Sequence, residues 1–157
     1  MNAPTSLAEF AKAYATDKLD WFRITGTKRF DYPIDYSVAV LEVDEATGRI
    51  DFLSRWEPNA YCHYHRHLGE TAVLVIEGEH NIVETRDNET IHKKRKPGFY
   101  TVNQGGDIHM EFGGEEGALV FFRCMAVDGK LFDVLDKDGN ILNTATVQDF
   151  TTGAVRR

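Results

Sequence analysis

The sequence predicts an all-β domain that closes as a sandwich or a double-sheet barrel. Runs of alternating apolar and polar residues recur along most of the chain, at spacings of roughly 8 to 12 residues. Clusters of Gly, Asn and Asp separate these runs and have the chemistry of tight turns. The chain has 157 residues, which is enough for one domain with its own core. We therefore expect a single barrel over residues 20–145, with an N-terminal helical segment at 1–19 and a C-terminal tail at 146–157.

A short helix is expected before the barrel, at residues 5–18. Thr5 or Ser6 can cap its first turn. The apolar residues that follow share one stripe at helical spacing, namely Leu7, Phe10, Ala11 and Tyr14. This helix is expected to pack on the outside of the domain or against a partner subunit.

The expected strands are short and have a period of two. In chain order they are 21–24, 36–43, 49–56, 60–67, 71–77, 79–85, 98–102, 108–112, 118–125, 130–135 and 140–142. Gly78 is expected to turn the chain between two of these strands, and the glycine-rich residues 113–117 are expected to form a loop. The tail from 147 to 155 is expected to form a short helix.

The charge of the chain limits its partners. The formal net charge of −7 argues against nucleic-acid binding, because a phosphate backbone requires a cationic surface. The basic run 92–96 is the exception, and because Pro97 and Gly98 follow it we expect a solvated loop, with a lid over an anionic substrate as the alternative. No apolar stretch approaches the ~20 residues that a membrane span needs, and no secretory signal is recognisable. We expect a cytoplasmic protein that binds neither membranes nor nucleic acids.

The two cysteines are expected to be free thiols. Cys62 and Cys124 lie far apart in the sequence, and neither belongs to a CxxC motif. Cys62 alternates out of phase with the histidines that follow it, so its side chain is expected to face away from theirs.

Residues 62–78 hold the strongest candidate for a functional site. His63, His65 and His67 alternate there, and side chains at i and i+2 of a strand project to the same face, roughly 7 Å apart. Such a strand can point two imidazoles into the interior of a barrel. A further ligand must come from elsewhere in the chain, and His109 is the candidate.

These residues resemble the two motifs of the cupins, a superfamily of small jelly-roll proteins with non-haem metal sites. The first cupin motif is a His-x-His pair followed by a Glu and then a Gly. The second is Gly-x5-Pro-x-Gly-x2-His, which the chain matches, with Gln in place of Pro, at Gly98, Gln104, Gly106 and His109. The resemblance covers about residues 35–125. It implies an all-β, single-domain cupin, which is a double-stranded β-helix or jelly-roll barrel.

The first motif fits the chain in two registers. Counting back from the glycine that ends the motif selects His65 and His67 as ligands and places Thr71 where the family's carboxylate lies. The other register takes His63 and His65 with Glu70 and requires a bulge before that glycine. We favour the first register, in which His63 lies beside the ligands or at the mouth of the cavity.

The favoured register implies a metal site of His65, His67 and His109 without a carboxylate. Three neutral imidazoles leave the full 2+ charge of the ion on the site, which favours an anionic, bidentate ligand such as an enolate. Imidazole ligands suit several metals, and three histidines also form one kind of catalytic zinc site. We expect Fe(II), with Zn, Ni, Cu or Mn as alternatives.

Cupins with such sites include the acetylacetone-cleaving dioxygenases and the 2,4'-dihydroxyacetophenone dioxygenases. Residues 129–140 resemble the closing hairpin of those enzymes. The acetylacetone enzymes carry an acidic residue six positions before the last metal-binding His, where this chain has Asn103. Residues 65–69 and 75–79 also resemble the metal-binding cupin domain of ChrR-type anti-sigma factors.

The resemblance implies a metal-dependent enzyme, a dioxygenase that uses Fe(II) and O2. Its small organic substrate would be a 1,3-diketone or an α-hydroxyketone, bound as a bidentate enolate and cleaved at a C–C bond. No catalytic residue is expected beyond the metal centre. One alternative is a non-catalytic regulatory cupin like the ChrR domain, and another is an isomerase or hydrolase that needs a metal but no O2. A homodimer is expected, because cupins often pair through exposed strands.

Strand alternation predicts which other side chains surround the metal centre. The expected cavity residues are Tyr61, Val73, Val75, Phe99, Thr101 and Phe121. Thr71 and Asn103 are expected beside the metal ligands. Arg66 lies between two ligands in sequence, so we expect it to face the other way and to form a structural salt bridge.

Overall fold

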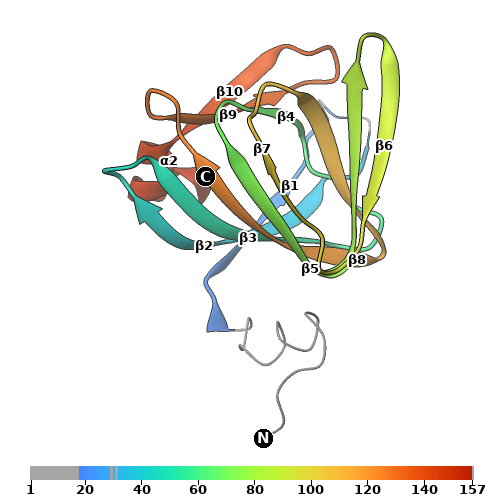
Figure 1. The fold of residues 1–157 in the computed structure, drawn as a ribbon, viewed down its shortest axis with the longest axis horizontal. Helices are drawn as coiled ribbons and strands as arrows, with labels where there is room; N and C mark the ends of the chain where they lie inside the picture. Colours follow the sequence, from blue (N-terminus) through green and yellow to red (C-terminus); the bar gives the residue numbers. More distant parts are fainter. Residues whose placement is uncertain (1–17, 29, 31, 157) are drawn as a thin grey trace, which may run out of the picture.

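The computed structural model describes residues 18–28, 30 and 32–156, and their fold is almost entirely β (Figure 1). The predicted N-terminal helix therefore lies, except for its last residue, outside the described residues. The elements are β1 (Trp21–Thr25), β2 (Asp35–Asp44), β3 (Arg49–Trp56), β4 (Tyr64–His67), β5 (Thr71–Arg86), β6 (Glu89–Arg95), β7 (Tyr100–Asn103), β8 (Ile108–Met125), β9 (Lys130–Leu135), β10 (Ile141–Thr146), the helix α2 (Val147–Thr152) and the 3-10 turn η2 (Ala154–Arg156).

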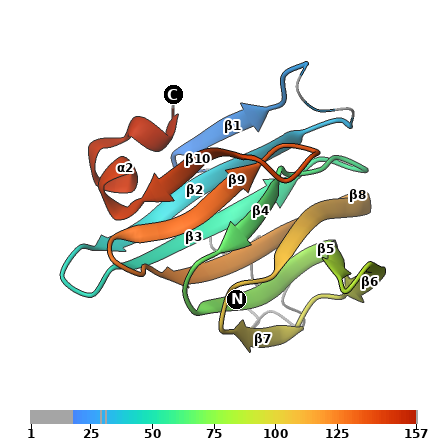
Figure 2. The same cartoon turned by 90° about the horizontal axis from the view of Figure 1, so that it is seen from above.

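The ten strands form one sheet that curls around an interior. Its order is β1-β2-β3-β8-β4-β9-β10, and β5 pairs with β8 while also carrying β6 and β7. All of the pairings between named strands are antiparallel. The β5–β6 hairpin lies at one side of the barrel and the β9–β10 hairpin at the other (Figures 1 and 2). The predicted all-β class is confirmed.

Two strands are much longer than the sequence pattern predicted. β5 has 16 residues and β8 has 18. Gly78 does not turn the chain: it lies inside β5 at φ +75°, beside two shifts in the register of β5 against β8. The predicted loop at 113–117 is likewise part of β8. Both expectations were wrong because glycine in a left-handed conformation also makes bulges, which bend a strand without ending it.

The basic run is a strand and not a solvated loop. Its first four residues belong to β6, which pairs with β5 through contacts such as Arg95 opposite His80. Lys94 is exposed, while Arg95 is only 6% exposed. Alternation along β6 therefore places one cation of the run inside the barrel.

The main core fills the barrel between β3, β5 and β8, with members such as Ile50, Val75 and Val120 that are fully buried. The predicted helix in the tail is present as α2, and Phe150 on α2 packs into this core. Thr146 and Asp149 form a capping box at the start of α2, which satisfies backbone N–H groups that a helix end leaves free. Among the described residues, no helix is long and apolar enough to cross a membrane.

Candidate metal centre

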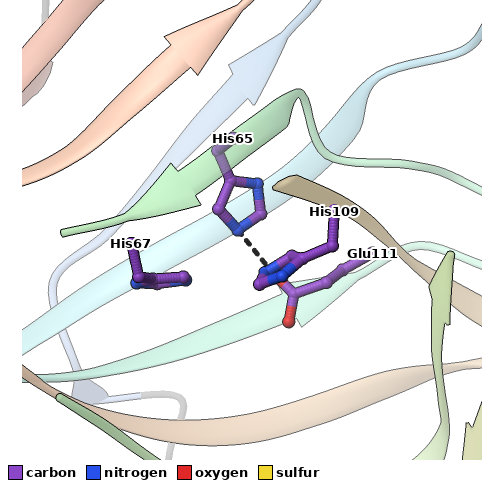
Figure 3. Close-up of side chains that lie close together, drawn as sticks. All are labelled: His65, His67, His109 and Glu111. Atoms are coloured by element: carbon purple, nitrogen blue, oxygen red, sulfur yellow. Dashed lines mark ion pairs between the residues drawn. The ribbon is translucent and has the colours of Figure 1, made fainter. Parts of the chain in front are cut away.

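The pairing of β4 with β8 builds the candidate site. His65 on β4 lies directly opposite His109 on β8. His67 and Glu111 each lie two residues further along their own strands, so they project to the same interior face. The four side chains converge on one point, as Figure 3 shows.

The four residues offer ligand atoms that all lie within 4.8 Å of one another. The ring centroid of His65 lies 4.5 Å from that of His109 and 5.0 Å from that of His67. The His65 and His109 side chains are 11% and 14% exposed, and that of Glu111 is 5% exposed. The site is therefore a buried cluster of three imidazoles and one carboxylate, which is a donor set that transition metals accept.

The carboxylate of the cluster comes from β8 and not from the position of Thr71. We expected a site without a carboxylate because Thr71 stands where the cupin motif places one. The structure supplies Glu111 from β8 instead, so that expectation was wrong. The signal was available, because Glu111 follows His109 at i+2 and a strand places i and i+2 on one face.

The two oxygens of Glu111 have different partners. Oε1 accepts from Nε2 of His80, a fully buried residue, at 2.8 Å. Oε2 lies 3.1 Å from Nε2 of His65 and 3.9 Å from Nε2 of His109. Burial alone would raise the pKa of Glu111, but its contacts with His65 and His80 hold it well below its ordinary value. Glu111 is therefore ionised, with Oε1 fixed and Oε2 directed into the cluster.

His65 is held between two acceptors. Its Nδ1 lies 2.8 Å from the backbone oxygen of His63, and its Nε2 faces Oε2 of Glu111. Burial alone would lower the pKa of His65, but Cys62 and Glu111 raise it well above its ordinary value. A positive charge is thus required between His65 and Glu111, and either a proton on Nε2 or a metal ion supplies it.

The other two imidazoles are neutral. Burial and the charge of His65 lower the pKa of His67 to about 3 and that of His109 well below its ordinary value. Nε2 of His109 is buried and has no hydrogen-bond partner in the described part of the chain. A buried polar atom without a partner is costly, and a metal ion at the centre of the cluster would satisfy it. The residues present therefore fit a metal ion.

The structure separates the two sequence registers. It brings together His65, His67 and His109, as the favoured register requires. Glu70 is exposed and contacts Gln104 at 3.4 Å, away from the cluster. His63 lies outside the cluster, where its ring packs on Phe30 at 4.8 Å between centroids.

Thr71, Asn103 and the cysteines take other places around the centre. Thr71 is buried and its hydroxyl contacts Cys124, whose Sγ lies 3.7 Å from Nδ1 of His67. Cys62 does not face away as expected: its Sγ lies 3.7 Å from Nδ1 of His65. It precedes β4, so the alternation on which that expectation relied does not reach it. Both thiols are free, and burial raises their pKa values.

Two cavities meet at the cluster. The larger, of about 990 Å³, is lined mostly by apolar and aromatic side chains from β1, β2, β3 and the C-terminal elements, together with His65, His67 and Glu111. The smaller, of about 210 Å³, is lined by polar and charged side chains of β5 and β6, together with His67, His109 and Glu111. The candidate metal centre thus forms part of the wall between an apolar and a polar space.

The predicted cavity residues fit this arrangement only in part. Val73 lines the smaller cavity, as do Thr71 and Asn103, which were expected beside the metal ligands. The residues that line neither cavity are Tyr61, Val75, Phe99, Thr101 and Phe121. Phe122 lines both cavities, whereas its neighbour Phe121 packs on the other face of β8 against Leu53 and Leu119. Alternation left Phe121 or Phe122 as the cavity aromatic, and the structure places Phe122 there and not Phe121. The walls from β1 and the C-terminal helix were not predicted.

Arg66 behaves as predicted. Its Nη2 lies 2.7 Å from Oδ2 of Asp133 on β9, and Asp133 also accepts a hydrogen bond from Thr144. This buried carboxylate ties β4 to the β9–β10 hairpin and so helps to hold the strand that carries His65 and His67.

Comparison with solved structures shows the fold. The chain is similar to an RmlC-like cupin from Ralstonia eutropha JMP134, with a TM-score of 0.67 and 15% identity over 89% of this chain and 82% of that one. It is similar to an acetylacetone dioxygenase from Acinetobacter johnsonii, with a TM-score of 0.63 and 12% identity over 85% of each chain. A putative acetylacetone dioxygenase from Methylibium petroleiphilum PM1 gives a TM-score of 0.64 and 12% identity over 88% of this chain and 90% of that one.

Comparison with curated proteins gave no significant match. Residues 12–128, about three quarters of the chain, match the family described as the ChrR cupin-like domain. The antiparallel sheet that curls around an interior agrees with a cupin fold. The chain belongs to the ChrR cupin-like domain family of the cupin superfamily.

Proposed function

We propose that this protein is a metal-dependent cupin enzyme that holds a divalent transition metal at His65, His67, His109 and Glu111. In its sharper form, the proposal is a non-haem Fe(II) dioxygenase that cleaves a C–C bond of a 1,3-diketone or an α-hydroxyketone. The observation that carries the proposal is the position of the cluster in the wall of an apolar cavity of about 990 Å³. A purely structural metal site would need no such space beside it.

The ligand atoms of the cluster support Fe(II) as the metal, for a different reason from the one that the sequence suggested. The sequence favoured iron through three histidines without a carboxylate, whereas the structure adds Glu111 to the cluster. Two histidines and one carboxylate are the ligands of many non-haem Fe(II) oxygenases, and the cluster contains that set with one histidine more. The similarity in fold to two proteins described as acetylacetone dioxygenases supports the same reaction class.

A bound Fe(II) ion would supply Lewis acidity and electrons for the reaction with O2. The protein's own residues supply position and shelter. His80 fixes Glu111, and the carbonyl of His63 fixes the ring of His65, so these two ligands are held in place before anything binds. Aromatic side chains of the larger cavity, among them Trp56 and Phe122, give the centre apolar surroundings on that side.

Tyr36 is the polar group best placed to meet a substrate oxygen in the larger cavity. Its hydroxyl lies 3.3 Å from Nδ1 of His63, and both residues line the cavity. Burial raises the pKa of Tyr36, and burial together with the charge of His65 lowers the pKa of His63 to about 4. Near neutral pH the phenol is therefore protonated and the imidazole is neutral, so the pair orients a polar substrate without adding charge.

The proposal is tested by oxygen uptake. Protein reconstituted anaerobically with Fe(II) should consume O2 when 1,3-diketones or α-hydroxyketones are added, and the metal-depleted protein should not. The His109→Ala variant should show no uptake. Absence of uptake across the whole panel, with iron bound at one ion per chain, would contradict the dioxygenase assignment.

A second candidate function is a non-catalytic metal-binding regulator. The family match to the ChrR cupin-like domain favours it, since that description names no reaction. Tight zinc binding without turnover of any panel compound would support the regulator. Turnover that persists without O2 would instead support a metal-dependent isomerase or hydrolase.

A further inference from the structure

We propose that the smaller cavity is a carboxylate-binding subsite, and that Arg95 is the residue that binds the anion. One conclusion rests on the proposed function: with the metal centre as the active site, a carboxylate bound by Arg95 makes the natural ligand a small organic acid. Binding of the carboxylate itself is a property of the cavity and of Arg95, and it can be measured without any reaction.

Arg95 is a buried cation that lacks a full set of partners. It is 6% exposed, and Nη1 of its guanidinium has no hydrogen-bond partner. The guanidinium lies over the ring of Phe99, with Cζ 4.7 Å from the ring centroid. The Phe99 ring holds the plane of the guanidinium in position. It accepts no hydrogen bond from the guanidinium N–H groups, which lie within that plane. An unsatisfied donor on a buried charge is costly, so a ligand that accepts from it is expected.

The other cations that line this cavity already have acidic partners. Nζ of Lys93 lies 3.1 Å from Oε1 of Glu84. Nη2 of Arg86 lies 3.3 Å from Glu84 and 2.6 Å from Asp107. No ion pair joins Arg95 to a carboxylate among the described residues, although it lines the same cavity. Arg95 is therefore the cation with capacity left for a bound anion.

The pairing of the strands brings Arg95 to the metal centre. Arg95 lies opposite His80 on β5, and His80 holds Oε1 of Glu111. His67 and His109 line the same cavity. An anion held by Arg95 would thus occupy the space onto which three of the four candidate metal ligands face.

The charges of the cavity agree with an anionic ligand. Its lining includes three basic side chains, Arg86, Lys93 and Arg95, and three acidic ones, Glu84, Asp107 and Glu111. These balance as they stand, so a divalent ion at the cluster would leave an excess of two positive charges. A carboxylate near Arg95 would reduce that excess.

Shape selects a carboxylate among anions. A guanidinium presents two parallel N–H groups in one plane, which match the two oxygens of a carboxylate. The volume of about 210 Å³ is large enough for a short acid. The amide groups of Asn103 and Gln104 also line the cavity and offer donors for a second polar group. Within the proposed substrate class, the subsite thereby favours short ketones that carry a carboxylate over uncharged ones.

The test is isothermal titration of malonate into the zinc-loaded and the metal-free protein. Malonate should bind, and Arg95→Gln should weaken its affinity by at least about tenfold, because a charge-assisted pair is lost. Lys94→Gln is the matched control, since it removes a charge from the exposed face of the same strand and should leave binding unchanged. Arg95→Lys, which keeps the charge but loses the fork, should bind malonate with an affinity between those of the wild type and Arg95→Gln.

Neutral malonamide and inorganic sulfate complete the design. Malonamide should not compete, and sulfate should bind more weakly than malonate. The proposal is overturned if malonate does not bind either form, if Arg95→Gln binds it as well as the wild type, or if sulfate binds equally well. Thermal unfolding of each variant checks that it folds, and Arg95→Lys keeps the test decisive if Arg95→Gln does not. In the metal-free protein, the difference between the wild type and Arg95→Gln is independent of metal binding and oxygen uptake, on which the proposed function depends.

Discussion

Nε2 of His80 lies 2.8 Å from Oε1 of Glu111, so a fully buried imidazole orients the carboxylate of the candidate metal centre. His80 stands on β5, two strands away from the histidines of β4, and it offers no atom to the cluster itself. Its contribution is to leave only Oε2 of Glu111 free to face His65 and His109.

The His80→Gln variant tests this relationship. Partners that orient a metal ligand typically contribute about 10–100-fold to metal affinity, and a loss in that range is expected here. His92→Gln is the control, because His92 lies outside the cluster and contacts Asn81. Zinc affinity measured by competition with a chelator decides the matter. Equal affinities in the two variants would show that His80 does not position Glu111.

A pair of substitutions tests the ligand register. His109→Ala should abolish stoichiometric metal binding, since it removes a ligand whose Nε2 has no other partner. Glu70→Gln should bind metal like the wild type, because Glu70 is exposed and contacts Gln104. Metal content per chain, measured by elemental analysis, checks both. Loss of metal from Glu70→Gln would revive the alternative register.

Metal affinity should depend on pH through His65. Its pKa is raised well above the ordinary value of 6.5, so the metal-free site carries a proton on His65 near neutral pH. An incoming ion must displace that proton, and affinity should fall about tenfold for each pH unit below the raised pKa. His67 and His109 are already neutral, so they release no proton when the metal binds and do not add to the pH dependence.

Calorimetry in two buffers of different ionisation enthalpy measures the proton count directly. Release of one proton per ion bound near neutral pH is the expected result. Binding without proton release would mean that His65 is already neutral, contrary to the charge pattern of the cluster.

The salt bridge between Arg66 and Asp133 should stabilise the fold in a pH-dependent way. Burial alone would raise the pKa of Asp133, but hydrogen bonds from Arg66 and Thr144 lower it below the ordinary 3.8. The stabilisation is therefore fully present above that ordinary value and is lost as the pH falls through the lower, folded-state pKa. Asp133→Asn should reduce the free energy of unfolding by about 1–3 kcal/mol at neutral pH.

Urea denaturation of Asp133→Asn and the wild type at neutral and acidic pH measures this difference. The difference should shrink in acid, where the wild-type carboxylate is protonated as well. A difference that stays constant with pH would assign the loss to packing and not to charge.

Much of the fold followed from periodicity. The strand 49–56 was predicted with the bounds that the structure gives β3, and the hairpin of β9 and β10 and the C-terminal helix were also anticipated. The two wrong predictions, a turn at Gly78 and a loop at 113–117, have one physical cause. Gly78 and the glycines of 113–117 have the chemistry of turns, but long antiparallel partners held β5 and β8 extended through them. Local sequence does not reveal that tertiary pairing.

The site was predictable to the extent that it obeys alternation. His65, His67 and His109 were selected from spacing and family resemblance, and the structure brings them together. Glu111 obeys the same rule, but the family resemblance places the carboxylate at the position of Thr71 and so pointed away from it. Arg95 was hidden for another reason, since a basic run before Pro-Gly has the composition of a loop and only the pairing of β6 with β5 buries it.

The central claim is that His65, His67, His109 and Glu111 bind one metal ion. The most direct measurement is anomalous diffraction from crystals of the metal-loaded protein, collected at the absorption edge of the metal. The account predicts a single peak inside the cluster, about 2.0–2.2 Å from the three histidine nitrogens and from one oxygen of Glu111. A fully loaded protein whose peak lies elsewhere, or whose Glu111 turns away from the ion, would contradict it.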